Sequence, residues 1–283
     1  MKKILVATTA LVAVAAAGSA YADGHEGGVS VSLSADIGFE SLDGVNGFGH
    51  DYDLSWSGST VTDGGLTVAA SGNADDETSP SVSVSGGFGS IAFGDEDDAL
   101  DAAMGGIDGG DTTSGAADLA GADASVGEDP LLYTSPDLGG ATAYVSVSLE
   151  GSAENTTGET GFGAGASLSL GGISVGGGFS QLGDASLAGV SAGLGAGPAD
   201  VKVAFQTGED AAGNAISNLD ASAAADLGGN TVGVQFVTDL EAETNGFAVF
   251  YSQGLGGGVT LNAAFGQDQA EATNYGVSLA ASF

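Results

Sequence analysis

The sequence contains no cysteine and no arginine, and its only basic residues are Lys2, Lys3 and Lys202. Without cysteine, disulfides and thiolate metal sites are excluded. The scarcity of cations argues against nucleic-acid binding, because Lys and Arg are the residues that neutralise phosphates. Only 4 prolines accompany 52 glycines, which argues against a collagen-like repeat, and 42% hydrophobic residues argue against general disorder.

The sequence also lacks an apolar run long enough to form a membrane-spanning helix. Its longest largely apolar stretch, 4–17, is shorter than the ~18 residues that such a helix needs. Because Lys2 and Lys3 precede this stretch and Ala20 and Ala22 follow it, we predict a cleaved signal peptide over 1–22 and a mature domain over 23–283. All 37 acidic residues lie in the mature part, where Lys202 is the one basic residue, so its formal charge is −36.

The mature chain alternates between apolar and small polar residues along most of its length. Over 29–39, Val29, Val31 and Leu33 fall on one face, while Ser30 and Ser32 fall on the other. About sixteen such runs follow one another, most near the ~9–11 residues that cross a bilayer when tilted. The predicted fold class is all-β, a transmembrane up-and-down antiparallel β-barrel of about 16 strands.

The connections between these runs also alternate in kind. After odd-numbered runs they are acidic and mostly long, at 40–49, 73–78, 94–129, 150–161, 181–184, 207–214, 239–244 and 267–273. After even-numbered runs they are short and rich in glycine, at 62–65, 86–89, 136–140, 171–172, 195–198, 227–229 and 254–258. Strict alternation indicates that the two rims of the sheet differ, as in outer-membrane barrels with short periplasmic turns and longer outer loops.

A water-soluble β-sandwich is the main competing fold, because its strands alternate as well. The solvent face of such strands usually carries Lys, Arg or Glu, whereas here the second face consists mostly of Ser, Gly, Thr and Ala. A small polar face suits a water-filled lumen, and a face of Val, Leu, Ile and Phe suits lipid. A secreted, calcium-dependent β-rich protein is a third alternative, although no tandem GGxGxDxUx repeat occurs.

Three short motifs resemble those of a known family. The stretch 85–95 (SGGFGSIAFGD) resembles the turn and strand before the constriction loop of alphaproteobacterial, Rhodobacter-type general porins. The stretch 128–151 is similar to the strand pair after that loop, and 60–72 to an early hairpin. Their order and the terminal Phe283 support the resemblance. It implies a homotrimeric outer-membrane porin that passes small hydrophilic solutes and ions passively, with outer-membrane lipid as a partner and no enzymatic activity.

The resemblance also implies that the long loop at 94–129 folds into the lumen and narrows it. The corresponding candidates for an acidic pore lining are Asp95, Glu96, Asp97, Asp98, Asp101, Asp108 and Asp111. The segment 96–104 (EDDALDAAM) has acidic residues first and Ala, Leu and Met later, so it predicts a short helix inside the loop.

The sequence departs from the family pattern in its basic residues. General porins set a basic cluster on the wall opposite the acidic loop, whereas this mature chain has Lys202 alone. Because Val201 and Val203 fall on the lipid side, we expect Lys202 to point into the lumen as a pore-wall residue. It is either a remnant of the opposing wall or the partner of a nearby carboxylate.

So much acid predicts a preference for cations, because carboxylates in a narrow passage attract cations and repel anions. Acidic outer loops also serve as a solvated surface at high salt, which is the alternative explanation of the acidic residues in these loops. Loosely bound Ca²⁺ or Mg²⁺ is a further expectation, with Asp95, Asp97 and Asp98 as weak Ca²⁺ candidates; no other cofactor is expected. The alternative function is a plugged structural or adhesive barrel with acidic, ion-binding outer loops.

Overall fold

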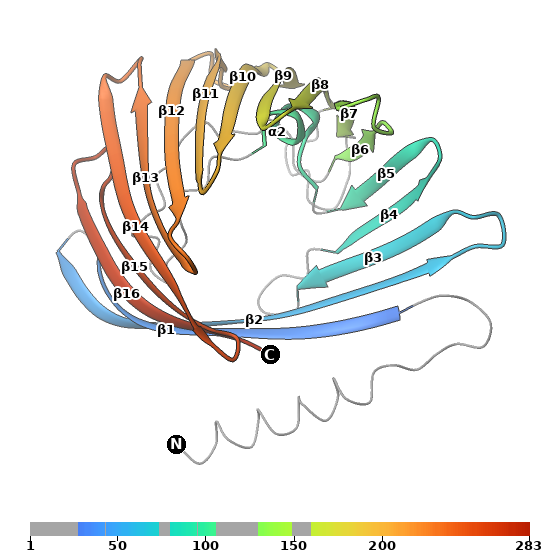
Figure 1. Ribbon diagram of the computed structural model, residues 1–283. Helices are drawn as coiled ribbons and strands as arrows, with labels where there is room; N and C mark the ends of the chain where they lie inside the picture. Colours follow the sequence, from blue (N-terminus) through green and yellow to red (C-terminus); the bar gives the residue numbers. More distant parts are fainter. Residues whose placement is uncertain (1–27, 43, 74–79, 95, 106–129, 149–159) are drawn as a thin grey trace.

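Sixteen antiparallel strands close into a barrel (Figure 1). The computed structural model describes residues 28–42, 44–73, 80–94, 96–105, 130–148 and 160–283. The strands are β1 (Gly28–Leu42), β2 (Val45–Val61), β3 (Thr67–Asn73), β4 (Ser81–Gly86), β5 (Gly89–Gly94), β6 (Leu131–Thr134), β7 (Ala141–Ser148), β8 (Gly161–Leu170), β9 (Ile173–Leu182), β10 (Ala185–Ala196), β11 (Ala199–Glu209), β12 (Ala215–Asp226), β13 (Asn230–Asp239), β14 (Thr244–Gly256), β15 (Val259–Gln267) and β16 (Thr273–Ser282). One helix, α2 (Ala99–Met104), lies within the described part. No helix there has the length and apolar character to cross a bilayer.

The barrel closes because the last strand pairs with the first. The register runs from Ser34 opposite Ser282 to Ser41 opposite Tyr275. Beyond the end of β16, the Phe283 N–H donates to the Leu33 carbonyl at 2.9 Å. Closure joins the first and last strands of the sheet, so the predicted fold of about 16 antiparallel strands is confirmed.

The alternation seen in the sequence separates two faces of the wall. Large apolar side chains point outward and are exposed, among them Ile37 at 63%, Val190 at 59% and Val277 at 51%. Contacting ring pairs, such as Phe162 with Phe179 and Phe247 with Phe265, lie toward the end of the barrel that carries the long connections. An exposed apolar belt with aromatic residues near its edge is typical of a surface that meets lipid.

The connections alternate as predicted, with one correction. Positions 40–49 were expected to form the first outer loop, but β1 continues to Leu42 and β2 begins at Val45. Only positions 43–44 intervene, and Gly44 has a positive φ of 76°. Gly47 and Gly49, which were assigned to the loop, therefore belong to β2.

Several acidic residues at the rims act as turn-forming side chains. The carboxylates of Asp210, Asp226, Asp239 and Asp268 each accept two backbone N–H bonds from the connection that follows them. At Asp210 the Asn214 side chain adds a third bond of 2.7 Å, and the bonds from Asn214 lower the pKa of this carboxyl from its usual 3.8. Part of the acidity is therefore required for local structure.

The lowered pKa of Asp210 leads to a first prediction. Because the folded pKa lies below the unfolded one, the stabilisation of this turn is complete above the usual pKa and is lost as the pH falls through the lowered value. NMR titration of the carboxyl is expected to give a midpoint below 3.8. Asn214→Ala removes the largest cause and is expected to raise the midpoint, whereas an unchanged midpoint would contradict this account.

A second prediction tests the outer face. Val277 lies in the middle of β16, and an Arg there would place a charge in hydrocarbon. Val277→Arg is expected to lower the free energy of unfolding in bilayers by about 2–4 kcal/mol. Ser57→Arg serves as the control, because Ser57 lies on the lumen face of β2. This variant is expected to lower the free energy of unfolding by under ~1 kcal/mol. Equal losses for the two variants in denaturant titrations would show that the two faces have been assigned wrongly.

Candidate functional site

The described start of the long connection forms a short helix inside the barrel (Figure 1). Asp98 caps α2, since its Oδ1 accepts the N–H groups of Leu100 at 2.8 Å and Asp101 at 3.0 Å. At the other end, the Gly105 N–H donates to Asp101 O at 2.7 Å, and Gly105 adopts a φ of 58°. The short helix predicted within 96–104 is confirmed, with Asp98 as its N-cap.

The helix lies against a part of the inner wall that is lined by glycine. Gly165, Gly178 and Gly189 are aligned across β8, β9 and β10, and α2 contacts all three strands. A Cβ added to Gly165 would come within 2.4 Å of Ala99 O. One added to Gly176 would come within 1.9 Å of Ala103 O. The glycines therefore let the helix backbone approach the wall more closely than any side chain would allow.

The apolar side of α2 is buried against the wall. Leu100 and Met104, one turn apart, pack with Leu187 of β10 and Ala204 of β11, and Leu100 has no exposed surface. Burial of a leucine contributes about 1.5–3 kcal/mol, so the helix is attached to the wall by a small hydrophobic core inside the lumen.

Hydrogen bonds attach the same segment at both ends. Near the start, Ser81 Oγ bonds the Glu96 carboxylate, and Ser146 Oγ accepts from Ala99 N at 3.0 Å. At the helix end, Ser191 Oγ donates to Met104 O at 2.8 Å. Lys202 Nζ donates to Gly105 O, which confirms that this side chain points into the lumen.

The wall across the lumen from α2 is acidic. Figure 1 shows β1 and β2 on the side of the barrel opposite the helix. Their register places Asp36 beside Asp51 and Ser34 beside Asp53, and Glu40 lies on the same face as Asp36. The outward positions between them are apolar or aromatic, including Ile37 and Tyr52.

The strand register shows independently that this acidic face points inward. Starting from Lys202, which reaches α2, the aligned residues run through Ser222, Gln235, Ala248, Gly266 and Asn274 to β16. On β16, Ala280 lies three alternating positions beyond Asn274, on the same face, and it pairs with Asp36. The four carboxylates of β1 and β2 therefore face the lumen.

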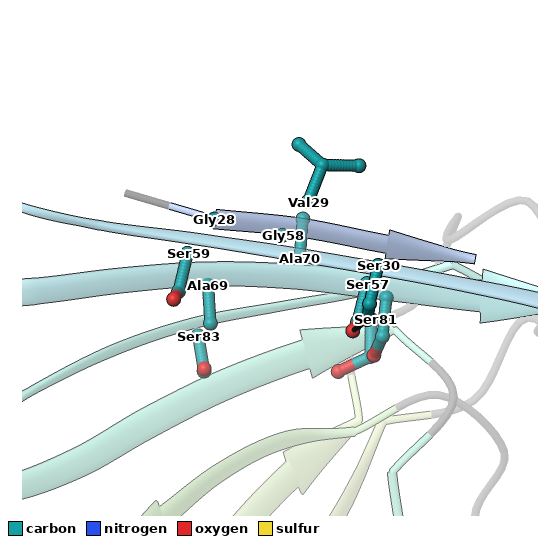
Figure 2. A pocket seen from close by; sticks show the side chains of 11 residues that line it. Gly28, Val29, Ser30, Ser57, Gly58, Ser59, Ala69, Ala70, Ser81 and Ser83 are labelled. Atoms are coloured by element: carbon teal, nitrogen blue, oxygen red, sulfur yellow. Dashed lines mark hydrogen bonds between the residues drawn. The ribbon is translucent and has the colours of Figure 1, made fainter. Parts of the chain in front are cut away.

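Toward the end of the barrel that carries the short connections, the same wall is lined with hydroxyl groups. A recess of about 460 Å³ is lined by serines of β1 to β4, and Figure 2 shows Ser59, Ser81 and Ser83 on the side away from Val29. Facing serines bond one another across β1 and β2, as Ser30 does with Ser57 at 2.7 Å. A wall of small hydroxyl groups suits enclosed water and hydrophilic solutes.

The predicted acidic lining divides into several environments. Asp97 is exposed, Asp101 and Glu96 are half-buried, and Asp98 is only 2% exposed because it caps the helix. Asp98 is therefore a structural carboxylate, which differs from the lining role anticipated for it. The candidates at 95, 108 and 111 lie outside the described residues.

Sequence reasoning missed both the acidic wall and the glycine wall. The signal for the first was present, because Asp36, Asp51 and Asp53 each alternate with residues assigned to the lipid face. The signal for the second was Gly163 and Gly165 at a spacing of two on the same face. Among the described side chains, no group of three or more His, Cys, Asp or Glu residues is arranged to hold a metal ion.

Comparisons with known proteins agree with this geometry. A family model described as Gram-negative porin matches residues 7–273. A porin structure refined at 1.8 Å is similar with a TM-score of 0.75 and 22% identity, over 90% of this chain and 100% of that one. An anion-selective porin from Comamonas acidovorans gives 0.68 and 17%, over 91% and 100%. A triple mutant of Rhodopseudomonas blastica porin gives 0.66 and 17%, over 90% and 100%. No curated protein sequence matches.

The close approach of α2 to the glycine wall leads to a third prediction. Gly176→Ala is expected to push the helix toward the barrel axis, since the atom in the way is a backbone oxygen. Such overpacking costs about 1–3 kcal/mol of stability and is expected to lower single-channel conductance. Gly254→Ala is the control, because the nearest atom to its added Cβ would be 3.9 Å away. Equal conductance in both variants would contradict the close packing.

Proposed function

This chain belongs to the Gram-negative porin family, and from that premise we propose that it is a cation-preferring diffusion channel. The family and the fold are those of a general porin of the bacterial outer membrane. The preference for cations, the homotrimeric assembly and the alphaproteobacterial type are the parts that we add. The last two rest on the motif resemblance at 60–72, 85–95 and 128–151.

The observation that carries the preference for cations is the acidic wall of β1 and β2. General porins, as the family resemblance implies, set a basic cluster opposite their acidic loop. Here Asp36, Asp51 and Asp53 line the lumen across from α2, where Asp97 and Asp101 are also accessible. Carboxylates on both sides of a passage raise the local concentration of cations and repel anions.

The fold by itself does not decide the sign of the selectivity. One structural relative is described as an anion-selective porin, and the structural match covers 100% of that protein. The proposal therefore rests on the side chains of this chain's own wall. We also propose that Ca²⁺ or Mg²⁺ associates only loosely with the acidic residues near α2, because Asp98 commits one oxygen to the helix cap.

A fourth prediction tests the preference in planar bilayers. Under a KCl gradient, the reversal potential of the purified mature protein is expected to lie toward the potassium equilibrium potential. A carboxylate about 8 Å from a monovalent ion contributes about 0.5 kcal/mol in water, and screening at ~0.1 M salt roughly halves this energy. Each carboxylate then raises the permeability of a cation and lowers that of an anion by about 1.5-fold, which is roughly twofold in their ratio. The pair Asp51→Asn and Asp53→Asn is therefore expected to lower the cation-to-anion permeability ratio on the order of five-fold.

Asp184→Asn removes one charge from a rim turn and is the control for this experiment. Beyond about 8 Å, physiological salt screens its field, so a small effect is expected. A reversal potential toward chloride would contradict the preference for cations. A silent bilayer would instead favour the plugged structural or adhesive barrel.

A further inference from the structure

The C-terminal end of α2 carries no positive charge of its own. Its last turn contains no basic residue, whereas its first turn is capped by Asp98 and carries Asp101. The negative end of a helix dipole and its unpaired carbonyls are normally stabilised by a nearby cation or by hydrogen-bond donors. This helix therefore needs partners from elsewhere in the chain at that end.

Both partners come from the barrel wall. Ser191 of β10 bonds Met104 O at 2.8 Å, and Lys202 of β11 bonds Gly105 O. Lys202 is separated from Gly105 by 97 positions in the sequence, and it is the only Lys or Arg beyond position 3. The single basic side chain of the mature part is thus used on the end of this helix.

We propose that Lys202 is a positioning residue that fixes the constriction helix against the wall and thereby keeps the passage at a constant width. This inference deepens the proposed function and rests on it, since width matters only if the lumen conducts. Its ammonium replaces the missing charge in the last helical turn, and its length lets it reach from β11 to the helix end. In this role its effect on permeant ions is indirect, through the position of α2.

The position of the ammonium separates this role from that of an ordinary wall charge. A wall charge acts at a distance, so the same change of charge at another lumen position would have a similar effect on permeant ions. A positioning residue acts through direct contact with the helix end, so only a side chain that places a donor and a positive charge there would replace it. Ser57→Asp changes the lumen charge by −1 without touching α2 and provides the matched control.

The experiment compares Lys202→Met, Lys202→Arg and Ser57→Asp with the parent protein. Hydrogen exchange of the amides at 99–105 is measured on the folded, detergent-solubilised barrel, and current fluctuations are recorded in planar bilayers. In Lys202→Met, exchange of these amides is expected to be at least tenfold faster, and the open channel is expected to flicker. Lys202→Arg is expected to restore slow exchange and steady current, and Ser57→Asp is expected to leave both as in the parent.

Slow exchange of these amides in Lys202→Met would overturn the proposal. The proposal would also fail if Lys202→Met and Ser57→Asp showed the same shift of reversal potential and no other difference from the parent. If Lys202→Met does not fold, Lys202→Gln, polar and neutral, is tested with the same measurements and the same criteria. Because hydrogen exchange needs no conduction, a silent bilayer with fast exchange in Lys202→Met would support the positioning role while contradicting the channel function.

Discussion

The structure depends on the requirement that every backbone N–H and C=O within a bilayer has a hydrogen-bond partner inside the protein. An open sheet cannot meet this requirement at its edges, and each unpaired group costs several kcal/mol in hydrocarbon. Pairing of β1 with β16 over 34–41, extended by the bonds between Leu33 and Phe283, joins the two edge strands of the sheet. Closure then gives every strand one lipid side and one lumen side.

Serines and glycines make up much of the lumen face, and their small side chains have two consequences. Serines and glycines leave open space beside β1 to β4, where the recess of about 460 Å³ lies. On β8 to β10, the same lack of side chains brings α2 against the wall. One wall is lined by carboxylates and hydroxyl groups, and α2 lies against the opposite wall, inside the barrel.

Much of the fold was predictable from the sequence because a period of two has only one geometric meaning in a strand. Val201 and Val203 on the lipid side were enough to orient Lys202, and the EDDALDAAM segment was enough to indicate α2. The early end of the first connection was missed because 40–49 was assigned as an outer loop from its acidic residues and its place after an odd-numbered run, although of its glycines only Gly44 has a positive φ. The acidic wall was missed because it depends on which strands face each other across the barrel.

The central claim is a closed barrel around an aqueous lumen with an acidic wall. Because the chain contains no cysteine, single cysteines introduced by mutation can test this claim directly. Ser55 and Leu54 are neighbours on β2 that face the lumen and the lipid, respectively. In vesicles, Ser55→Cys is expected to react with membrane-impermeant thiol reagents, and faster with a cationic reagent than with an anionic one, while Leu54→Cys stays unreactive. Reaction at Leu54→Cys, or faster labelling of Ser55→Cys by the anionic reagent, would contradict the account.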